Sequence, residues 1–146
     1  MGKRRKARES ALQILFQLEF NEANPEDIIQ TFWQNRRASE ETVSYSRDLV
    51  TGILSHREEI DRLIQSVSEH WRLSRMAIVD RNVLRIAVYE LVYGKDLSPA
   101  IPINEAIEIA KKYSSEEAAT FVNGILDAVR KKMDTMEKPP EDKKNA

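Results

Sequence analysis

Apolar residues recur at helical spacing along most of the chain, and no segment alternates with period two for long enough to predict a strand. The first periodic segment covers about residues 3–20. Its apolar face consists of Ala7, Ala11, Ile14, Leu15 and Leu18. Asn24 followed by Pro25 predicts the start of a second helix that ends near Asn35, because asparagine caps helices and proline suits the first helical position.

Three more helices follow from the same spacing. A third begins at Ser39 or Glu40. The S-x-x-E pattern that starts at Ser55 predicts a capping box, and therefore a break before a fourth helix. The fifth helix is expected over about residues 75–93, with Gly94 directly after its end, where glycine is favoured.

The last third of the chain predicts two further helices. Pro99 and Pro102 bracket an expected loop, because proline lacks a backbone N–H, so the sixth helix is expected from Ile103 onward. A second capping-box candidate begins at Ser114, and the seventh helix is expected to end near Met133. Seven helices joined by short loops predict an all-α protein made of two small antiparallel bundles that share one core.

Length and composition fit one cytoplasmic domain without catalytic equipment. A chain of 146 residues buries enough surface for a single core, and the absence of cysteine removes disulfides and thiol chemistry. No apolar run approaches the roughly 20 residues that span a bilayer, so we expect no membrane association. His56 and His70 lack metal-site spacing, and the four glycines form no phosphate-binding loop. We therefore expect no metal, no cofactor and no enzymatic activity.

Charge is nearly balanced over the whole chain but clustered at its start. The formal net charge is −1, which gives no global attraction to nucleic acid. The cluster before Glu9 consists of Lys3, Arg4, Arg5, Lys6 and Arg8. Residues 134–146 mix both charges around Pro139 and Pro140, so we expect a domain over residues 1–133 and a disordered tail over residues 134–146.

Two interpretations of the basic start remain open from the pattern alone. It is either a solvated helix end or an RNA contact, since short basic runs are weakly specific. Phe16 on the same helix favours RNA, because cations neutralise phosphates while an aromatic ring stacks on a base. Phe121 is offset by one position from the apolar stripe of the seventh helix, which would place it at the edge of the core, although spacing alone favours packing within the core.

Four segments closely resemble the signature motifs of the NusB family and occur in the family's order. They are RESALQILF at residues 8–16, DRNVLRIAVYEL at 80–91, INEAIEIAK at 103–111 and FVNGILD at 121–127. The resemblance covers about residues 3–133. It leaves out the linker around residues 35–39 and the last dozen or so residues, so no function is carried onto either.

The resemblance implies an antitermination factor that binds boxA RNA, as a single strand, together with the ribosomal protein NusE. The complex would join RNA polymerase and support transcription of ribosomal RNA operons. RNA contacts would fall on Arg4, Arg5, Lys6, Arg8, Phe16, Glu117 and Phe121, and partner or RNA contacts on Asp80 and Arg85. Glu117 would place a negative charge near phosphate, which would weaken RNA binding and make it depend on the partner.

Other functions stay open beside this one. The same helical module occurs as the RNA-binding part of certain rRNA cytosine methyltransferases, but no catalytic segment is recognisable in this chain. A helical module for protein interaction or homodimerisation, or a factor in rRNA maturation without an antitermination role, would also fit the pattern.

Overall fold

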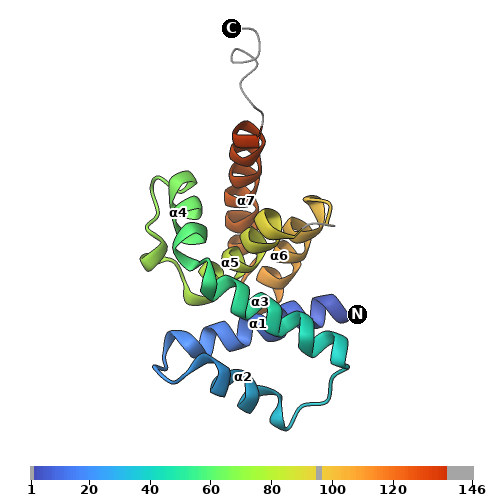
Figure 1. The fold of residues 1–146 in the computed structure, drawn as a ribbon. Helices are drawn as coiled ribbons and strands as arrows, with labels where there is room; N and C mark the ends of the chain where they lie inside the picture. The colour runs from blue at the N-terminus through green and yellow to red at the C-terminus, as the bar shows by residue number, and fades with distance from the viewer. Residues whose placement is uncertain (1, 95–96, 138–146) are drawn as a thin grey trace, which may run out of the picture.

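The computed structural model describes residues 2–94 and 97–137, and within them it contains seven α-helices, one 3-10 helix and no strand (Figure 1). The α-helices are α1 (Lys3–Glu19), α2 (Pro25–Gln34), α3 (Glu40–Ser55), α4 (Arg57–Val67), α5 (Ile78–Tyr93), α6 (Ala100–Tyr113) and α7 (Glu116–Glu137). The 3-10 helix η1 (Leu73–Arg75) lies between α4 and α5. The predicted all-α class is confirmed. No helix within the described residues combines the length and the apolar character that crossing a membrane requires.

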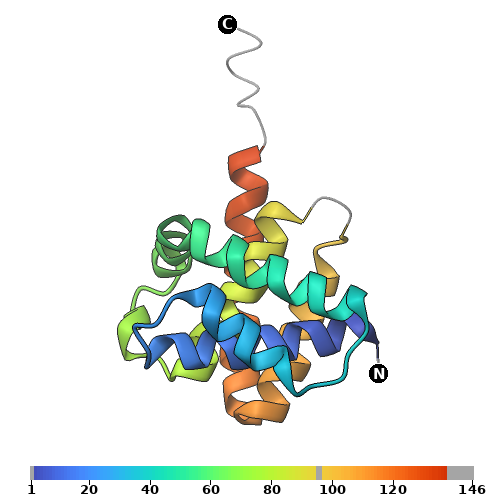
Figure 2. The same ribbon diagram turned by 60° about the horizontal axis from the view of Figure 1, so that its bottom comes forward.

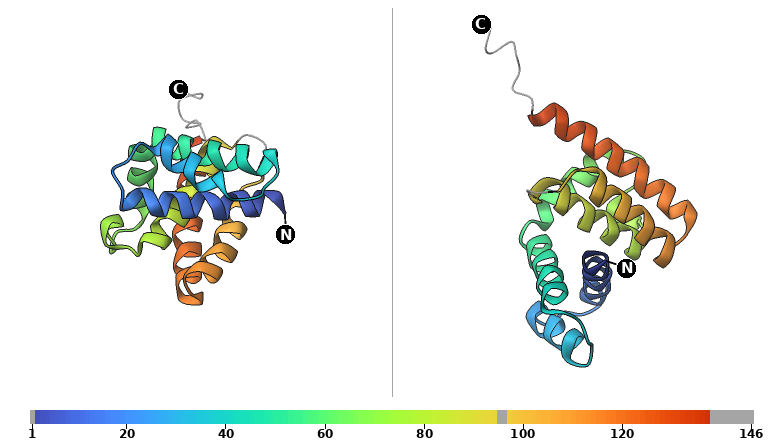
Figure 3. Two further views of the ribbon diagram at one scale, coloured as in Figure 1. Left: turned by 90° about the horizontal axis from the view of Figure 1, so that it is seen from below. Right: turned by 90° about the vertical axis from the view of Figure 1, so that its right-hand side faces the viewer.

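The helices form two groups that meet at α5. Helices α1, α2 and α3 pack together on one side, and α4, α6 and α7 pack around α5 on the other (Figures 2 and 3). Helix α5 also contacts α1 and α3, so it joins the two groups. Its buried apolar side chains are Val83, Leu84, Ile86, Ala87 and Val88. Burial on several sides explains why apolar residues occur on more than one face of α5 and why Asn82, Arg85 and Glu90 are buried with them.

Polar side chains cap three of the helix starts that the sequence predicts. The Asn24 side chain accepts a hydrogen bond from the Glu26 N–H at 2.9 Å, and Pro25 follows as the first helical residue. The Ser39 hydroxyl accepts from the Thr42 N–H at 3.1 Å. Helix α7 is capped by Ser115, whose hydroxyl accepts from the Ala118 N–H at 3.0 Å, one position after the predicted Ser114. Each bond satisfies a backbone donor that the helix leaves unpaired.

The predicted capping box at Ser55 is wrong. Ser55 is the last residue of α3, and its hydroxyl donates back to the Thr51 carbonyl at 2.9 Å. Helix α4 begins after His56 without a side-chain cap. Gly94 ends α5 with φ of −78°, so it does not adopt the left-handed conformation for which glycine was expected there.

The boundaries of the last two helices also differ from the prediction. Helix α6 begins at Ala100 and carries Pro102 in its first turn, where a missing N–H costs no intrahelical bond. Helix α7 continues to Glu137, past the expected end at Met133. The remainder of the predicted disordered tail, residues 138–146, lies outside the described residues.

Candidate nucleic-acid interface

Three of the five clustered cations lie at the surface at the start of α1. Lys3, Arg4 and Lys6 are exposed. The Lys3 ammonium is 3.6 Å from a carboxylate oxygen of Glu41, and the Lys6 ammonium donates to the Arg37 carbonyl at 3.3 Å. The Arg4 guanidinium stands 4.9 Å from the centroid of the Tyr45 ring. These weak, exposed contacts leave all three charges available to an anionic ligand.

Arg5 is held by a carboxylate on another helix. Its Nε and one terminal nitrogen donate to the two oxygens of Glu105 on α6, at 2.7 and 2.5 Å. This bidentate pair raises the pKa of Arg5 and holds the pKa of Glu105 below its ordinary value. Because Glu105 occupies the guanidinium fork, a phosphate has to displace it before it can use the same donors.

Arg8 lies in the interior, with only 3% of its surface exposed. Its guanidinium donates to both oxygens of Glu90 on α5, at 2.8 and 3.0 Å, and to Glu105 at 3.2 Å. The Tyr45 hydroxyl donates to the same Glu90 carboxylate, and burial together with this bond raises the pKa of Tyr45 to about 12. An RNA contact through Arg8 requires an exposed guanidinium, and the structure buries it instead.

A second ionic network encloses Arg85 at the other end of α1. Arg85 donates to both oxygens of Asp61, at 2.8 and 3.0 Å, and to Glu19 at 3.1 Å. Arg81 binds the Glu19 carboxylate at 2.8 and 2.7 Å and holds its pKa at about 2. The Arg85 side chain is almost fully buried in this network, so the expectation of a direct partner or RNA contact through it does not agree with its position.

Three of the predicted residues meet in a cleft between the start of α5 and the start of α7. Asp80, Glu117 and Phe121 line a cavity of about 290 Å³, together with Trp71 and Arg75. We call this cavity the aromatic cleft, because the rings of Trp71 and Phe121 form its walls at a centroid distance of 6.0 Å and an angle of 80°. Trp71 is 59% exposed, which is unusual for so large an apolar side chain.

The predicted residues in the cleft differ in exposure. Phe121 is half-buried and packs against the core from its edge, not within it as spacing alone favoured, whereas Glu117 is exposed. One carboxylate oxygen of Asp80 is buried without a hydrogen-bond partner among the described residues. Sequence reasoning missed Trp71 and Arg75. The sequence did offer a signal for them, because a tryptophan and two arginines occur between residues 71 and 75, where the helical period breaks.

The end of α6 connects the start of α1 with the aromatic cleft. Lys112 and Tyr113 donate to the Glu9 carboxylate at 3.0 and 2.9 Å, so α1 lies beside the corner between α6 and α7 (Figure 3, left). Phe16, which is 39% exposed, lies seven residues after Glu9 and therefore on the same face of α1. Figure 3 (left) shows α1 and the corner between α6 and α7 on one side of the molecule, and the exposed cations, Phe16 and the aromatic cleft belong to these elements. We call this side the α1–cleft face.

Exposed cations combined with exposed aromatic rings are the surface chemistry of proteins that bind RNA, here on an all-helical scaffold. The chain matches the model of the NusB family over residues 5–131 and belongs to that family. The family expected from the sequence motifs is confirmed.

Individual relatives agree with this assignment. The chain is 44% identical to the transcription antitermination protein NusB of Myxococcus xanthus, over 88% of this chain and 95% of the relative. NusB from T. maritima matches with a TM-score of 0.81 at 38% identity, over 98% of this chain and 97% of that one. A NusB structure solved with NusE and double-stranded RNA matches with a TM-score of 0.80 at 31% identity, over 90% and 98%.

Proposed function

We propose that this protein is a transcription antitermination factor that binds boxA RNA together with NusE. The complex assembles on RNA polymerase and supports transcription of ribosomal RNA operons. The names of the curated relatives and the NusB–NusE–RNA structure support this role. The observation that carries it is the α1–cleft face, whose elements carry both exposed cations and exposed aromatic rings. This role is one of binding and assembly in the cytoplasm, where transcription takes place, and it includes no catalytic step.

Each part of the α1–cleft face takes a different part of the RNA. Lys3, Arg4 and Lys6 neutralise phosphates, since their charges are exposed and only weakly paired. Trp71 and Phe121 stack on unpaired bases in the aromatic cleft, a mode that requires single-stranded RNA. Arg5 contributes only where a phosphate displaces Glu105, and Arg8 and Arg85 act from the interior by holding α1 against α5.

Glu117 and Asp80 make the cleft partly acidic, and this limits RNA binding in the absence of a partner. Glu117 is exposed beside Phe121, where its carboxylate repels phosphate. A basic surface of NusE would neutralise both carboxylates and complete the site. Glu117→Gln therefore tightens boxA binding without NusE and changes it little with NusE. Without NusE and at the same salt concentration, equal boxA affinities of the wild type and the Glu117→Gln variant would contradict this role.

Fluorescence anisotropy with labelled boxA RNA tests the whole proposal, with and without NusE. Three exposed cations predict a slope of log K against log salt of about −2, at about −0.7 for each contact with single-stranded RNA. Scrambled RNA and double-stranded RNA serve as controls. We expect boxA to be preferred over both, and most strongly when NusE is bound. Equal affinity for boxA and scrambled RNA in the presence of NusE would overturn the proposal.

A further inference from the structure

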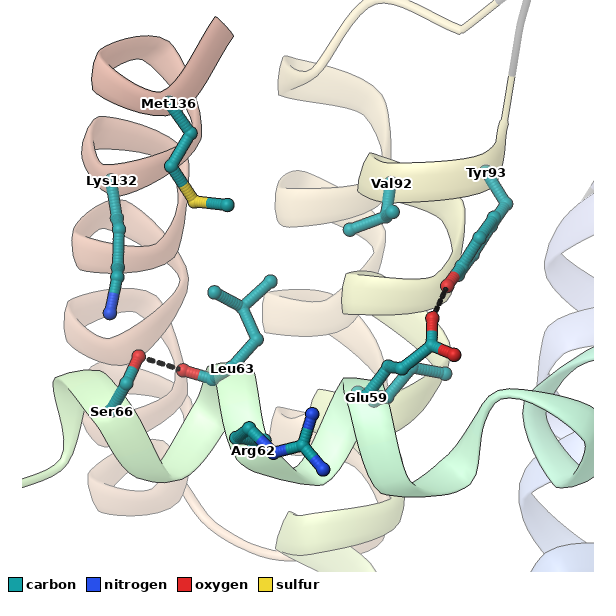
Figure 4. A pocket seen from close by; sticks show the side chains of 9 residues that line it. Glu59, Arg62, Leu63, Ser66, Val92, Tyr93, Lys132 and Met136 are labelled. Atoms are coloured by element: carbon teal, nitrogen blue, oxygen red, sulfur yellow. Dashed lines mark hydrogen bonds between the residues drawn. The ribbon is translucent and has the colours of Figure 1, made fainter.

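A second concave surface lies at the opposite ends of the helices that form the aromatic cleft. It is a groove of about 300 Å³ between α4, the end of α5 and the end of α7 (Figure 4). We call it the α4–α7 groove. Phe121 and Met136 are about 22 Å apart along α7, at the rise of an α-helix, so the groove is separate from the proposed RNA site.

The inner surface of the groove is apolar and open to solvent. Ile60 and Leu63 of α4, Val92 and Tyr93 of α5 and Met136 of α7 line it. Val92 is 40% exposed and Met136 is 68% exposed. Large apolar side chains that gather around an open groove are typical of a surface that binds another protein. Figure 4 shows Leu63, Val92 and Met136 directed into the space between the three helices.

Two cations and one carboxylate line the groove. Arg62 and Lys132 line it from α4 and α7, and neither makes an ion pair or a side-chain hydrogen bond among the described residues. The acid on the same rim, Glu59, accepts a hydrogen bond from the Tyr93 hydroxyl at 2.7 Å and lies 3.7 Å from His56. One carboxylate thus stands against two cations, and both cations remain available to a ligand.

We propose that the α4–α7 groove binds a short amphipathic helix of a partner protein, with leucine-like side chains on one face and acidic residues along its flanks. The apolar residues would receive the anchors, as in other helix-in-groove interfaces. Arg62 and Lys132 would pair with the acidic flanks. A second copy of this chain fits less well, because two copies that meet at this groove would bring Arg62 and Lys132 of one copy against the same two cations of the other.

The test uses designed peptides and the full chain. The first peptide, about 14 residues long, carries leucine at i, i+3 and i+7 with glutamate on both flanks, and the second has lysine in place of each glutamate. Methyl NMR titration follows Leu63, Val92 and Met136 in the groove and Ala118 beside the aromatic cleft. We expect shifts confined to the groove and at least tenfold tighter binding of the acidic peptide.

Charge reversal provides the control. Arg62→Glu combined with Lys132→Glu should reverse the preference between the two peptides and leave boxA affinity unchanged, so the result is separable from the proposed RNA function. Arg130→Glu alters an exposed arginine of α7 that does not line the groove, and it should change neither. Equal binding of both peptides, shifts at Ala118 instead of the groove, or self-association in sedimentation without peptide would each overturn the proposal.

Discussion

Helix α1 carries two sets of charged residues that differ in their surroundings. Arg8 and Glu19 are enclosed by partners on α5, whereas Lys3, Arg4 and Lys6 lie at the surface with weak contacts. Arg8 is only two residues from Lys6, yet it faces α5. The comparison shows that position around the helix, and not residue type, separates the cations that hold the fold together from those that can meet RNA.

The two buried networks join α1 to α5 with opposite polarity. At one end an arginine of α1 binds a glutamate of α5, through Arg8 and Glu90. At the other end a glutamate of α1 binds arginines of α5, through Glu19, Arg81 and Arg85. Reversing the relative direction of the two helices would place like charges together. The networks therefore specify how the two helix groups are oriented, a use of buried ion pairs that goes beyond stability.

Removing Arg8 should lower the free energy of unfolding more than any other substitution proposed for this protein. Arg8→Ala leaves the buried Glu90 carboxylate without its main partner, and breaking a buried pair in this way costs about 3–5 kcal/mol. The free energy of unfolding in urea measures it. Lys6→Ala is the matched control on the same helix, and it should change stability by no more than about 0.5 kcal/mol. Equal stability of the two variants would remove the distinction between buried and exposed cations.

Glu19 makes the second network sensitive to acid. The pKa of Glu19 is about 2 in the folded protein, below its ordinary value of 4.5, so its contribution is complete above pH 4.5 and disappears as the pH falls toward 2. The shift corresponds to about 3 kcal/mol. Glu19→Gln should therefore be less stable than the wild type at pH 7, and the difference in free energy of unfolding between the two proteins should be smaller at pH 3. A gap in unfolding free energy that does not vary with pH would contradict this account.

The exposed aromatic residues should affect RNA binding and leave the fold intact. Trp71→Ala removes a stacking surface worth about 1–3 kcal/mol per base. Affinity for boxA in the presence of NusE should fall by that amount, and the thermal midpoint should stay nearly constant because Trp71 is exposed. Trp71→Phe, which keeps an aromatic ring, should recover most of the loss. A loss of the same size in both variants would argue against stacking.

Much of the fold was predictable because local signals determine it. The caps at Asn24 and Ser39 and the helical spacing of apolar residues give the element order directly. The first turn of α6 was not predictable, because a proline fits both a loop and the first turn of a helix, and the sequence alone did not show where the helix starts. The burial of Arg8 could have been predicted from the sequence, because Arg8 lies three and four residues before the buried Ala11 and Leu12 and therefore on the same face of the helix.

The side-chain pairs between distant segments could not be predicted from the sequence. Nothing in the spacing of residues brings Trp71 to Phe121, or Glu105 to Arg5, because each pair joins segments that meet only after folding. The assignment of Phe16, Glu117 and Phe121 to RNA remains a prediction. The exposure of Phe16 and the cleft that Glu117 and Phe121 line support it.

Glu105→Gln should have a smaller effect, in the direction of tighter RNA binding. The change removes the negative charge that occupies the Arg5 guanidinium, so one more cation becomes available to phosphate. The slope of log K against log salt should become steeper by about 0.7. Unfolding in urea serves as a check, since Glu105 also contacts Arg8. A slope equal to that of the wild type would mean that Arg5 takes no part in RNA binding.

The most direct test of the central claim is the salt dependence of boxA binding in the Arg4→Ala/Lys6→Ala double variant with NusE present. These two cations are exposed on the α1–cleft face, so the slope of log K against log salt should flatten by about 1.4 while the free energy of unfolding stays unchanged. A wild-type slope in this variant would show that the exposed start of α1 does not contact RNA, and would contradict the account.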